Sequence, residues 1–141
     1  YEEILAQASN LNLNAPWLQW TGDLSETELI HAILAADVIA LPFKEGANLR
    51  RSTLIMALSL GRPVVTTEPQ TPIPFLESGH NIMLARRDDQ ADFARQLALI
   101  LRYEPTLQRL ERNAATLKQH FDWDVIAGQY VAAYEGVRGK G

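Results

Sequence analysis

The chain contains no cysteine, only two methionines and no long run of apolar residues. Without cysteine it has no disulfide framework and no site for a thiolate-bound metal. No apolar stretch approaches the roughly 20 residues that a membrane-spanning helix needs. The three histidines, His31, His80 and His120, do not have the spacing of metal ligands, so we expect no metal and no cofactor.

Several catalytic signatures are also missing. The sequence has no Walker-type loop, no Gly-x-Ser-x-Gly and no Gly-x-Gly-x-x-Gly. Its net charge of -4 argues against a general nucleic-acid-binding protein. The chain begins Tyr1-Glu2-Glu3, with neither an initiator methionine nor the basic start of a signal peptide. We therefore expect a cytoplasmic fragment of a larger protein, with any membrane association made through another part.

What the sequence does contain is typical of a globular protein. It has 141 residues, of which 47% are apolar, which predicts one domain over residues 1–141. A chain of about 150 residues buries roughly two thirds of its unfolded surface, so a substantial core is expected. No internal repeat and no low-complexity tract is present.

Helix and strand signals alternate along the chain. Apolar runs predict strands at 17–20, 38–43, 64–67 and 81–85, with 38–43 buried on both faces of a parallel sheet. Helical signals cover 4–8 (the end of a helix), 25–36, the segment up to Gly61, and most of the region after Asp88 or Asp89. A turn at 71–74 is expected to lead into a short helix through Glu77. This order predicts an α/β fold, a Rossmann-like parallel sheet with flanking helices and a helical C-terminal third.

Three helices carry specific signals. Ser25 followed by Glu28 forms a capping box, and Gly61 followed by Pro63 is a usual helix stop. The helix after Asp88 or Asp89 is expected to turn four side chains inward: Phe93, Leu97, Ile100 and Leu101. Apolar residues at 107, 110, 114, 117 and 121 predict one amphipathic helix, and Asp122 begins a final one.

The strongest functional signal is the stretch 44–53, which joins the predicted strand at 38–43 to the next helix. Arg50 and Arg51 lie at or near the first turn of that helix, where cations oppose the helix dipole. An anion held between these arginines and the helix start explains the pattern, because helix N-termini bind anions. Ser52 and Thr53 add hydroxyl groups, and a diphosphate suits such a site.

A simpler interpretation of the same residues remains open. Arg50 and Arg51 are then solvated surface residues, one of them paired with Glu45. Glu45 itself is either a hydrogen-bond acceptor for sugar hydroxyls or a charge that keeps the loop soluble. The position of the loop at the carboxyl end of a strand favours the functional interpretation.

The order of motifs resembles the C-terminal domain of GT-B glycosyltransferases of the retaining family 4, also called group 1. Residues 20–25 with Glu28 and Leu29 are similar to that family's F-x-G strand and capped helix, and residues 36–43 to its A-D-V-x-x-x-P strand. Residues 56–65 are similar to E-A-M-A-x-G-x-P-V-V, and residues 121–123 to its closing F-x-W segment. Four motifs in family order make the resemblance specific.

This resemblance implies a nucleotide-sugar-binding domain in which the segment 45–56 holds the donor. It implies catalytic roles for Glu45, Arg50 and Arg51, with Arg50 and Arg51 on the diphosphate and Glu45 near the sugar. The implied donor-binding residues are Gly22 and Asp23 near the base, the backbone of Gly46, Ala47 and Asn48 at the diphosphate, the Asn48 side chain at the sugar, and Ser52 and Thr53. The implied partners are a donor such as a UDP-sugar and an N-terminal acceptor domain of the same polypeptide.

The sequence departs from the family at one place. The family usually carries two glutamates eight positions apart in this segment. Counting back from Gly61 places Met56 at the second, and counting from Glu45 places Thr53 there. A loop of the form acid-Gly-x-x-x-Arg-Arg looks like that of a divergent branch of the family. We therefore expect a retaining glycosyltransferase, and keep two alternatives: a non-catalytic nucleotide-binding or interaction domain derived from such an enzyme, and another kind of Rossmann-like module.

Overall fold

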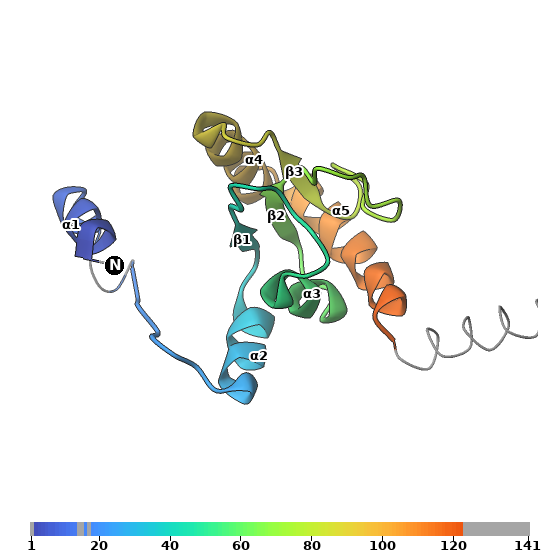
Figure 1. Ribbon diagram of the computed structural model, residues 1–141, viewed down its shortest axis with the longest axis horizontal. Helices are drawn as coiled ribbons and strands as arrows, with labels where there is room; N and C mark the ends of the chain where they lie inside the picture. The colour runs from blue at the N-terminus through green and yellow to red at the C-terminus, as the bar shows by residue number, and fades with distance from the viewer. Residues whose placement is uncertain (1, 14–15, 17, 123–141) are drawn as a thin grey trace, which may run out of the picture.

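A computed structural model describes residues 2–13, 16 and 18–122. Its centre is a parallel sheet of three strands in the order β1 (Ile39–Leu41), β2 (Val64–Thr67) and β3 (Met83–Ala85) (Figure 1). Ile39 pairs with Val64, and Val65 pairs with Met83. The helices are α1 (Glu2–Asn10), α2 (Glu26–Ala35), α3 (Ser52–Ser59), α4 (Gln90–Arg102), α5 (Glu104–Ala114) and the 3₁₀ helix η1 (Ala115–His120).

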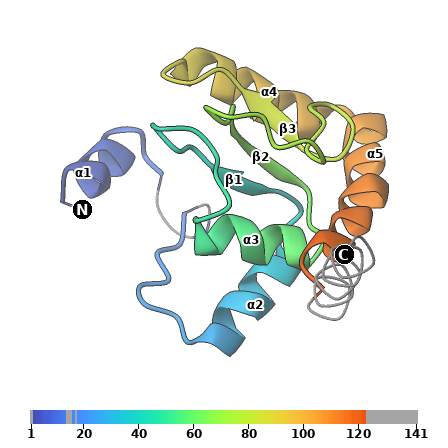
Figure 2. The same ribbon diagram turned by 45° about the vertical axis from the view of Figure 1, so that its right-hand side comes forward.

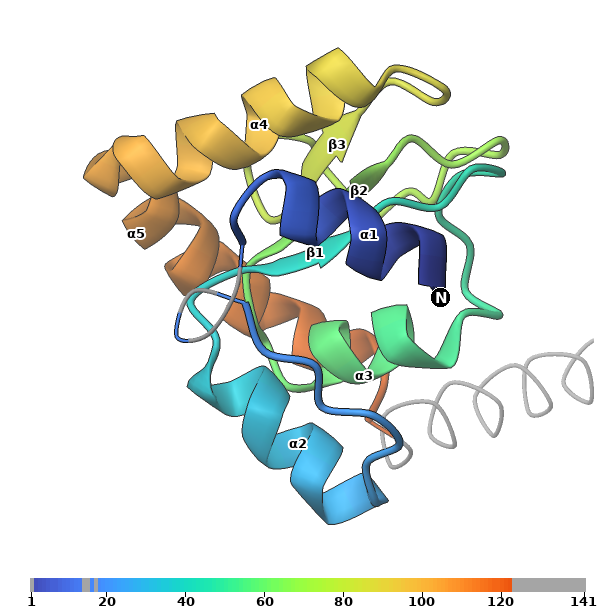
Figure 3. The ribbon, with the colours of Figure 1, turned by 90° about the vertical axis from the view of Figure 1, so that its left-hand side faces the viewer.

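Helices flank the sheet on both sides, as the sequence predicts for a Rossmann-like α/β fold. Figures 2 and 3 show α4 on one side of the strands and α3 on the other. Because β1, β2 and β3 run parallel, the loops that follow β1 and β2 both begin at the carboxyl edge of the sheet. Within the described part of the chain, no helix is long and apolar enough to cross a membrane.

The core follows the alternation of side chains along β2, which is buried throughout. Val64 packs into one apolar cluster with Leu54, Leu58 and Leu117, whereas Val65 packs into a second cluster that includes Ile100. Successive residues of a strand point to opposite faces, so adjacent valines serve the two layers. Truncating a fully buried leucine of this kind to alanine typically costs about 2–5 kcal/mol.

Both helix signals of the capping type are confirmed. Ser25 donates its backbone N–H to Glu28 Oε2 at 2.9 Å, and Glu28 N–H donates to Ser25 Oγ at 3.4 Å. After α3, Gly61 has φ +64°, and its N–H donates to the Leu58 carbonyl while Arg62 N–H donates to that of Ala57. These two bonds form a Schellman motif, which explains why α3 stops at the predicted glycine.

The predicted strand at 17–20 is wrong for its described residues, 18–20, which form no strand. Within the described residues β1 lies at the edge of the sheet and pairs with β2 alone, and residues 18–20 do not add a strand to its other edge. The edge position also explains a second correction. β1 is shorter than predicted and is not buried on both faces, because Ala40 is exposed and α4 packs against β2 and β3 instead.

Three smaller expectations also need correction. Leu101 is 58% exposed, because it lies off the face of α4 that carries Phe93, Leu97 and Ile100. The amphipathic segment from Leu107 is not one helix, since α5 ends at Ala114 and continues as η1. The turn at 71–74 leads into no helix. The final helix expected after Asp122 lies outside the described residues.

Candidate functional site

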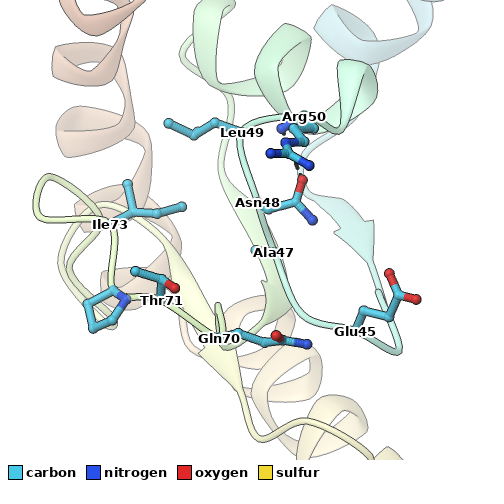
Figure 4. Close-up of a pocket in the computed structure, with 9 residues that line it drawn as sticks. Glu45, Ala47, Asn48, Leu49, Arg50, Gln70, Thr71 and Ile73 are labelled. Atoms are coloured by element: carbon cyan, nitrogen blue, oxygen red, sulfur yellow. Dashed lines mark hydrogen bonds between the residues drawn. The ribbon is translucent and has the colours of Figure 1, made fainter.

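A cavity of about 520 Å³ lies beside the loop that follows β1, at the carboxyl edge of the sheet. Two loops line it, as Figure 4 shows. The β1–α3 loop contributes Glu45, Ala47, Asn48, Leu49 and Arg50, and the β2–β3 loop contributes Gln70, Thr71, Pro72 and Ile73. Four of the residues proposed from the sequence, Glu45, Ala47, Asn48 and Arg50, are therefore brought together around one cavity.

Gly46 fixes the path of the β1–α3 loop against the neighbouring strand end. Its φ is +87°, and a Cβ added there would lie 2.3 Å from the Glu68 carbonyl oxygen. Only glycine permits both this backbone conformation and this approach. The next residue continues the contact, because Ala47 N–H donates to the Thr67 carbonyl at 3.1 Å. The two loops are thus attached to each other beside the cavity.

The same contacts limit which backbone amides can meet a ligand. Gly46 N–H donates to the Phe43 carbonyl at 3.0 Å, and Ala47 N–H is taken by Thr67. Both residues are buried. Of the three amides that the resemblance assigns to a diphosphate, only that of Asn48 has no backbone acceptor within the described residues.

The two arginines differ in their surroundings. Arg51 forms an ion pair with Glu45, with 3.0 Å between Nη2 and Oε2, and its guanidinium lies 5.0 Å from the centre of the Phe43 ring. This pair is the one that the simpler interpretation allowed. Arg51 does not line the cavity.

Arg50 lines the cavity and is exposed. Its backbone N–H donates to Asn48 Oδ1 at 3.0 Å, which holds the chain in a tight turn just before α3. Its guanidinium makes no hydrogen bond or ion pair with any residue that the structure describes. Arg50 is therefore a cation at the cavity whose charge is not neutralised by a neighbour.

The start of α3 adds to this positive character. Its N-cap, Arg51, makes no side-chain capping bond, and the first turn contains no acidic residue. The first N–H groups of a helix have no partner within the helix and carry its positive dipole end. Ser52 and Thr53 belong to this turn, although neither lines the cavity.

Gly22 and Asp23 are not part of this arrangement. They precede α2, whose N-terminal end lies away from the β1–α3 loop in Figures 1 and 2. Residues 18–25 make no strand, so no pairing with the sheet draws them towards its carboxyl edge. The structure does not bring these two residues to the cavity.

Sequence reasoning missed the second wall of the cavity, which Gln70, Thr71, Pro72 and Ile73 form. The segment 71–74 was predicted as a turn leading into a short helix, without a role in the site. One signal was available, because the carboxyl ends of neighbouring parallel strands lie at the same edge of a sheet. The loop after Thr67 must therefore start beside the loop after Leu41.

A second cavity, of about 650 Å³, lies on the α4 side of the same edge. Apolar side chains of Phe43, Phe93 and Leu97 form much of its wall, and Arg86 and Asp89 lie at its rim. These two charges pair with each other at 2.9 Å. No group of three histidine or acidic side chains suited to a metal ion occurs in the described parts of the chain.

Asp92 lies behind this rim and is almost fully buried, with 3% of its surface exposed. Its carboxylate accepts the backbone N–H of Arg86 at 2.7 Å and contacts the side chain of Arg95. The Arg86 N–H bond is the main reason why the pKa of Asp92 is lowered. Arg86, Asp89 and Asp92 are thus satisfied within the fold, whereas Lys44 and Asp88, which line the second cavity, have no ion pair in the described ranges.

Comparison with known proteins identifies relatives of the chain. The family described as "Glycosyl transferases group 1" matches residues 1–102. A phosphatidyl-myo-inositol mannosyltransferase of Mycobacterium leprae is 26% identical over 140 residues, which cover 99% of this chain and 36% of the relative. The N,N'-diacetylbacillosaminyl-diphospho-undecaprenol alpha-1,3-N-acetylgalactosaminyltransferase of Campylobacter jejuni is 21% identical over 126 residues, covering 89% and 32%. The chain spans about a third of the length of these curated relatives.

Solved structures share its fold. Sucrose-phosphate synthase from Thermosynechococcus elongatus superposes with a TM-score of 0.73 at 19% identity, covering 99% of this chain and 35% of that structure. Anabaena HepE, solved in complex with UDP and glucose, superposes with a TM-score of 0.75 at 20% identity, covering 96% and 36%. The Rossmann-like parallel sheet of this chain, with its flanking helices, therefore matches the fold of these two structures.

Proposed function

The chain belongs to the group 1 glycosyl transferases, and from this membership we propose that it supplies the donor-binding half-site of a sugar-transferring enzyme. In this proposal residues 1–141 form a single domain, the C-terminal half of a two-domain polypeptide. The other half, an N-terminal domain, binds the acceptor. The donor is a nucleotide diphosphate sugar, and its anomeric configuration is retained. The carrying observation is the unneutralised Arg50 at a cavity beside the start of α3.

In this reaction the protein's main contributions are to position the two substrates and to stabilise the negative charge on the departing diphosphate. The bond between the anomeric carbon and the β-phosphate oxygen breaks, and the diphosphate leaves with the electron pair. The oxygen of an acceptor hydroxyl forms the new bond on the same face of the anomeric carbon, and its proton passes to the departing diphosphate. Arg50 and the N–H groups at the start of α3 stabilise the charge that develops on the departing diphosphate. Arginine suits this role because it engages phosphate oxygens bidentately.

Glu45 and Asn48 are proposed as the sugar contacts from the β1–α3 loop. Both line the cavity together with Arg50. HepE was solved in complex with UDP and glucose, which supports a donor of this class. In our proposal Arg51 acts through Glu45, because its guanidinium is held by that carboxylate and by the Phe43 ring.

A non-catalytic nucleotide-binding domain is the second candidate, and one observation favours it. Met56 and Thr53, the two positions at which the second family glutamate is expected, carry no carboxylate, and Met56 packs against the apolar core. A ribose hydroxyl would then lack its usual acidic partner. Hydrolysis or transfer of a bound nucleotide sugar by the intact protein would decide against this candidate.

The proposal is tested by titrating the intact protein with UDP, GDP and ADP, each free and sugar-linked, in a calorimeter. We expect one nucleotide class to bind, and Arg50→Ala to weaken it by about 10- to 100-fold, the loss expected for charge-assisted hydrogen bonds. Arg102→Ala, an exposed arginine at the end of α4, is the matched control and should bind as the wild type does. Absence of binding at millimolar nucleotide would refute the proposal.

A further inference from the structure

Two polar residues of the β2–β3 loop, Gln70 and Thr71, line the cavity but are not among the proposed contacts to the diphosphate or the sugar. We infer that Gln70 and Thr71 recognise the sugar of the donor and favour a neutral hexose. The inference rests on the proposed function, since it assigns one end of the same cavity to the sugar. It adds a second wall, which the sequence signals around residues 44–53 do not include.

Both ends of the cavity are polar, but the charged side chain is Glu45 at one end and Arg50 at the other. In Figure 4, Gln70 lies at the same end as Glu45, and Arg50 lies at the opposite end. Thr71 lies on the wall opposite Asn48. We place the sugar of a diphosphate held by Arg50 at the end of the cavity where Gln70 and Glu45 lie.

The wall that carries Gln70 and Thr71 is held at the strand end where it begins. Glu68 N–H donates to the Ala85 carbonyl at 2.8 Å, and the Glu68 carbonyl oxygen packs against Gly46. This contact sets the distance between the two loops just before Gln70. A site whose two walls are held at a fixed distance binds its ligand without the entropic cost of ordering a loop.

The far end of the same loop is held by a buried amide. Asn81 is 7% exposed, accepts the N–H of Glu77 at 2.9 Å and donates to the Phe75 carbonyl at 2.9 Å. The Phe75 ring also stacks on His120, with 4.1 Å between ring centres. Both ends of the wall are therefore fixed to the fold, and Gln70 and Thr71 project from a supported segment.

The polar groups of the wall are unused. Neither the Gln70 amide nor the Thr71 hydroxyl makes a hydrogen bond with a residue in the described ranges, and both side chains are exposed. An amide offers both donors and acceptors, and a hydroxyl does the same on a smaller scale. Sugar hydroxyls need this mixture, because each one donates and accepts.

Charge at this end argues for a neutral sugar. Glu45 is the only charged side chain among the cavity residues besides Arg50, and its carboxylate is 75% exposed. A uronic acid would bring a second carboxylate towards Glu45, which is already paired with Arg51, so the second carboxylate would find no unpaired cation among the cavity residues at this end. A neutral hexose meets no such penalty.

The test compares free and sugar-linked nucleotides on the intact protein, with UDP, UDP-glucose and UDP-glucuronic acid as probes, or GDP and GDP-mannose if guanosine is preferred. The measured quantity is the ratio of the Kd for the free nucleotide to the Kd for its sugar-linked form. We expect Gln70→Ala and Thr71→Val each to lower this ratio by about 3- to 10-fold, the loss of a hydrogen bond between uncharged groups. The Kd for the free nucleotide should not change.

Two further variants make the result specific. Gln119→Ala removes an exposed amide far along the chain, on η1, and should leave the ratio unchanged. Arg50→Ala should weaken free and sugar-linked nucleotides alike. Thermal unfolding of each variant, followed by circular dichroism, checks that the fold is retained.

The outcomes separate the two claims. If the wild type binds no nucleotide, the proposed function fails and this inference fails with it. If nucleotide binds but the ratio is unchanged in both wall variants, or the wild type does not distinguish free from sugar-linked forms, only this inference is overturned. A loss of free-nucleotide binding in Gln70→Ala would also overturn it, because Gln70 would then contact the nucleotide. Tighter binding of UDP-glucuronic acid than of UDP-glucose would refute the neutral-sugar preference.

Discussion

Two cavities lie at the carboxyl edge of the same sheet, and they differ in what they leave unsatisfied. Around the β1–α3 loop, the side chains of Arg50, Gln70 and Thr71 line a cavity and make no hydrogen bond or ion pair with a described residue. On the α4 side, Arg86 pairs with Asp89, whereas Lys44 and Asp88 have no ion pair in the described ranges and much of the wall is apolar. A ligand gains most where it does not compete with bonds already formed inside the protein. The smaller cavity is therefore the better candidate for a polar ligand.

The largest effect should follow from a change at the contact that builds the first cavity. Gly46→Ala places a Cβ 2.3 Å from the Glu68 carbonyl oxygen, so the two loops must separate. We expect a loss of about 2–4 kcal/mol in the free energy of unfolding, from left-handed backbone strain plus the forced displacement. Nucleotide binding should be lost with it. Urea unfolding and calorimetric titration measure the two effects.

Gly79→Ala is the matched control for this change. Gly79 has φ +75°, close to that of Gly46, but an added Cβ would meet nothing within 4 Å. It should lose only about 1–2 kcal/mol from the backbone strain. Equal losses for the two variants would mean that the close approach of Gly46 to Glu68 does not hold the cavity together.

An intermediate effect is expected on the α4 side of the sheet, at Asp92, whose carboxylate is satisfied internally. Asp92 has a pKa below its ordinary value of 3.8, chiefly because it accepts the Arg86 N–H. A carboxylate with a lowered folded-state pKa stabilises the fold above its unfolded pKa, and this contribution disappears as the pH falls through the folded value. Asp92→Asn should therefore be less stable than the wild type at pH 7, with the difference shrinking below about pH 4.

The comparison predicts that this loss of stability leaves the donor site intact. Asp92→Asn should bind nucleotide with the wild-type Kd at temperatures where it is folded, because Asp92 does not line the first cavity. Asp88→Asn serves as the control, since Asp88 is exposed and has no ion pair in the described ranges. Thermal unfolding at pH 3 to 7 and titration at pH 7 give both measurements. Weakened nucleotide binding by folded Asp92→Asn would show that the two cavities are coupled.

The accuracy of the sequence-based predictions depended on how local each signal was. The capping box at Ser25, the stop at Gly61 and the buried strand at 64–67 are each encoded within a few residues, and each is confirmed. The strand predicted at 17–20 and the burial of Ala40 depend on which strands lie alongside, and both were wrong, the strand for its described residues 18–20. Pairing across a sheet is not written in either strand alone.

The candidate site divides in the same way. Glu45 and Arg50 share a cavity because they belong to one short loop after a strand, which the sequence shows directly. Gln70 and Thr71 were missed because their position depends on a contact between segments distant in the sequence, that of Gly46 with Glu68. The sequence also left open whether an arginine pairs with Glu45, because the side-chain positions in a loop depend on the contacts that hold the loop in place.

The smallest effect is expected for Arg51, and it tests whether the contrast between paired and unpaired groups also holds within one loop. Because the Arg51–Glu45 pair is exposed, its loss in Arg51→Ala should change the free energy of unfolding by less than about 1 kcal/mol. Nucleotide affinity should fall far less than in Arg50→Ala. In a double-mutant cycle, the effects of Arg51→Ala and Glu45→Gln on the free energy of unfolding should not be additive, because the two residues form one ion pair. If Arg51→Ala weakens UDP as much as Arg50→Ala does, the guanidinium leaves Glu45 for the phosphate, and a group that is paired in the free protein is available to the ligand after all.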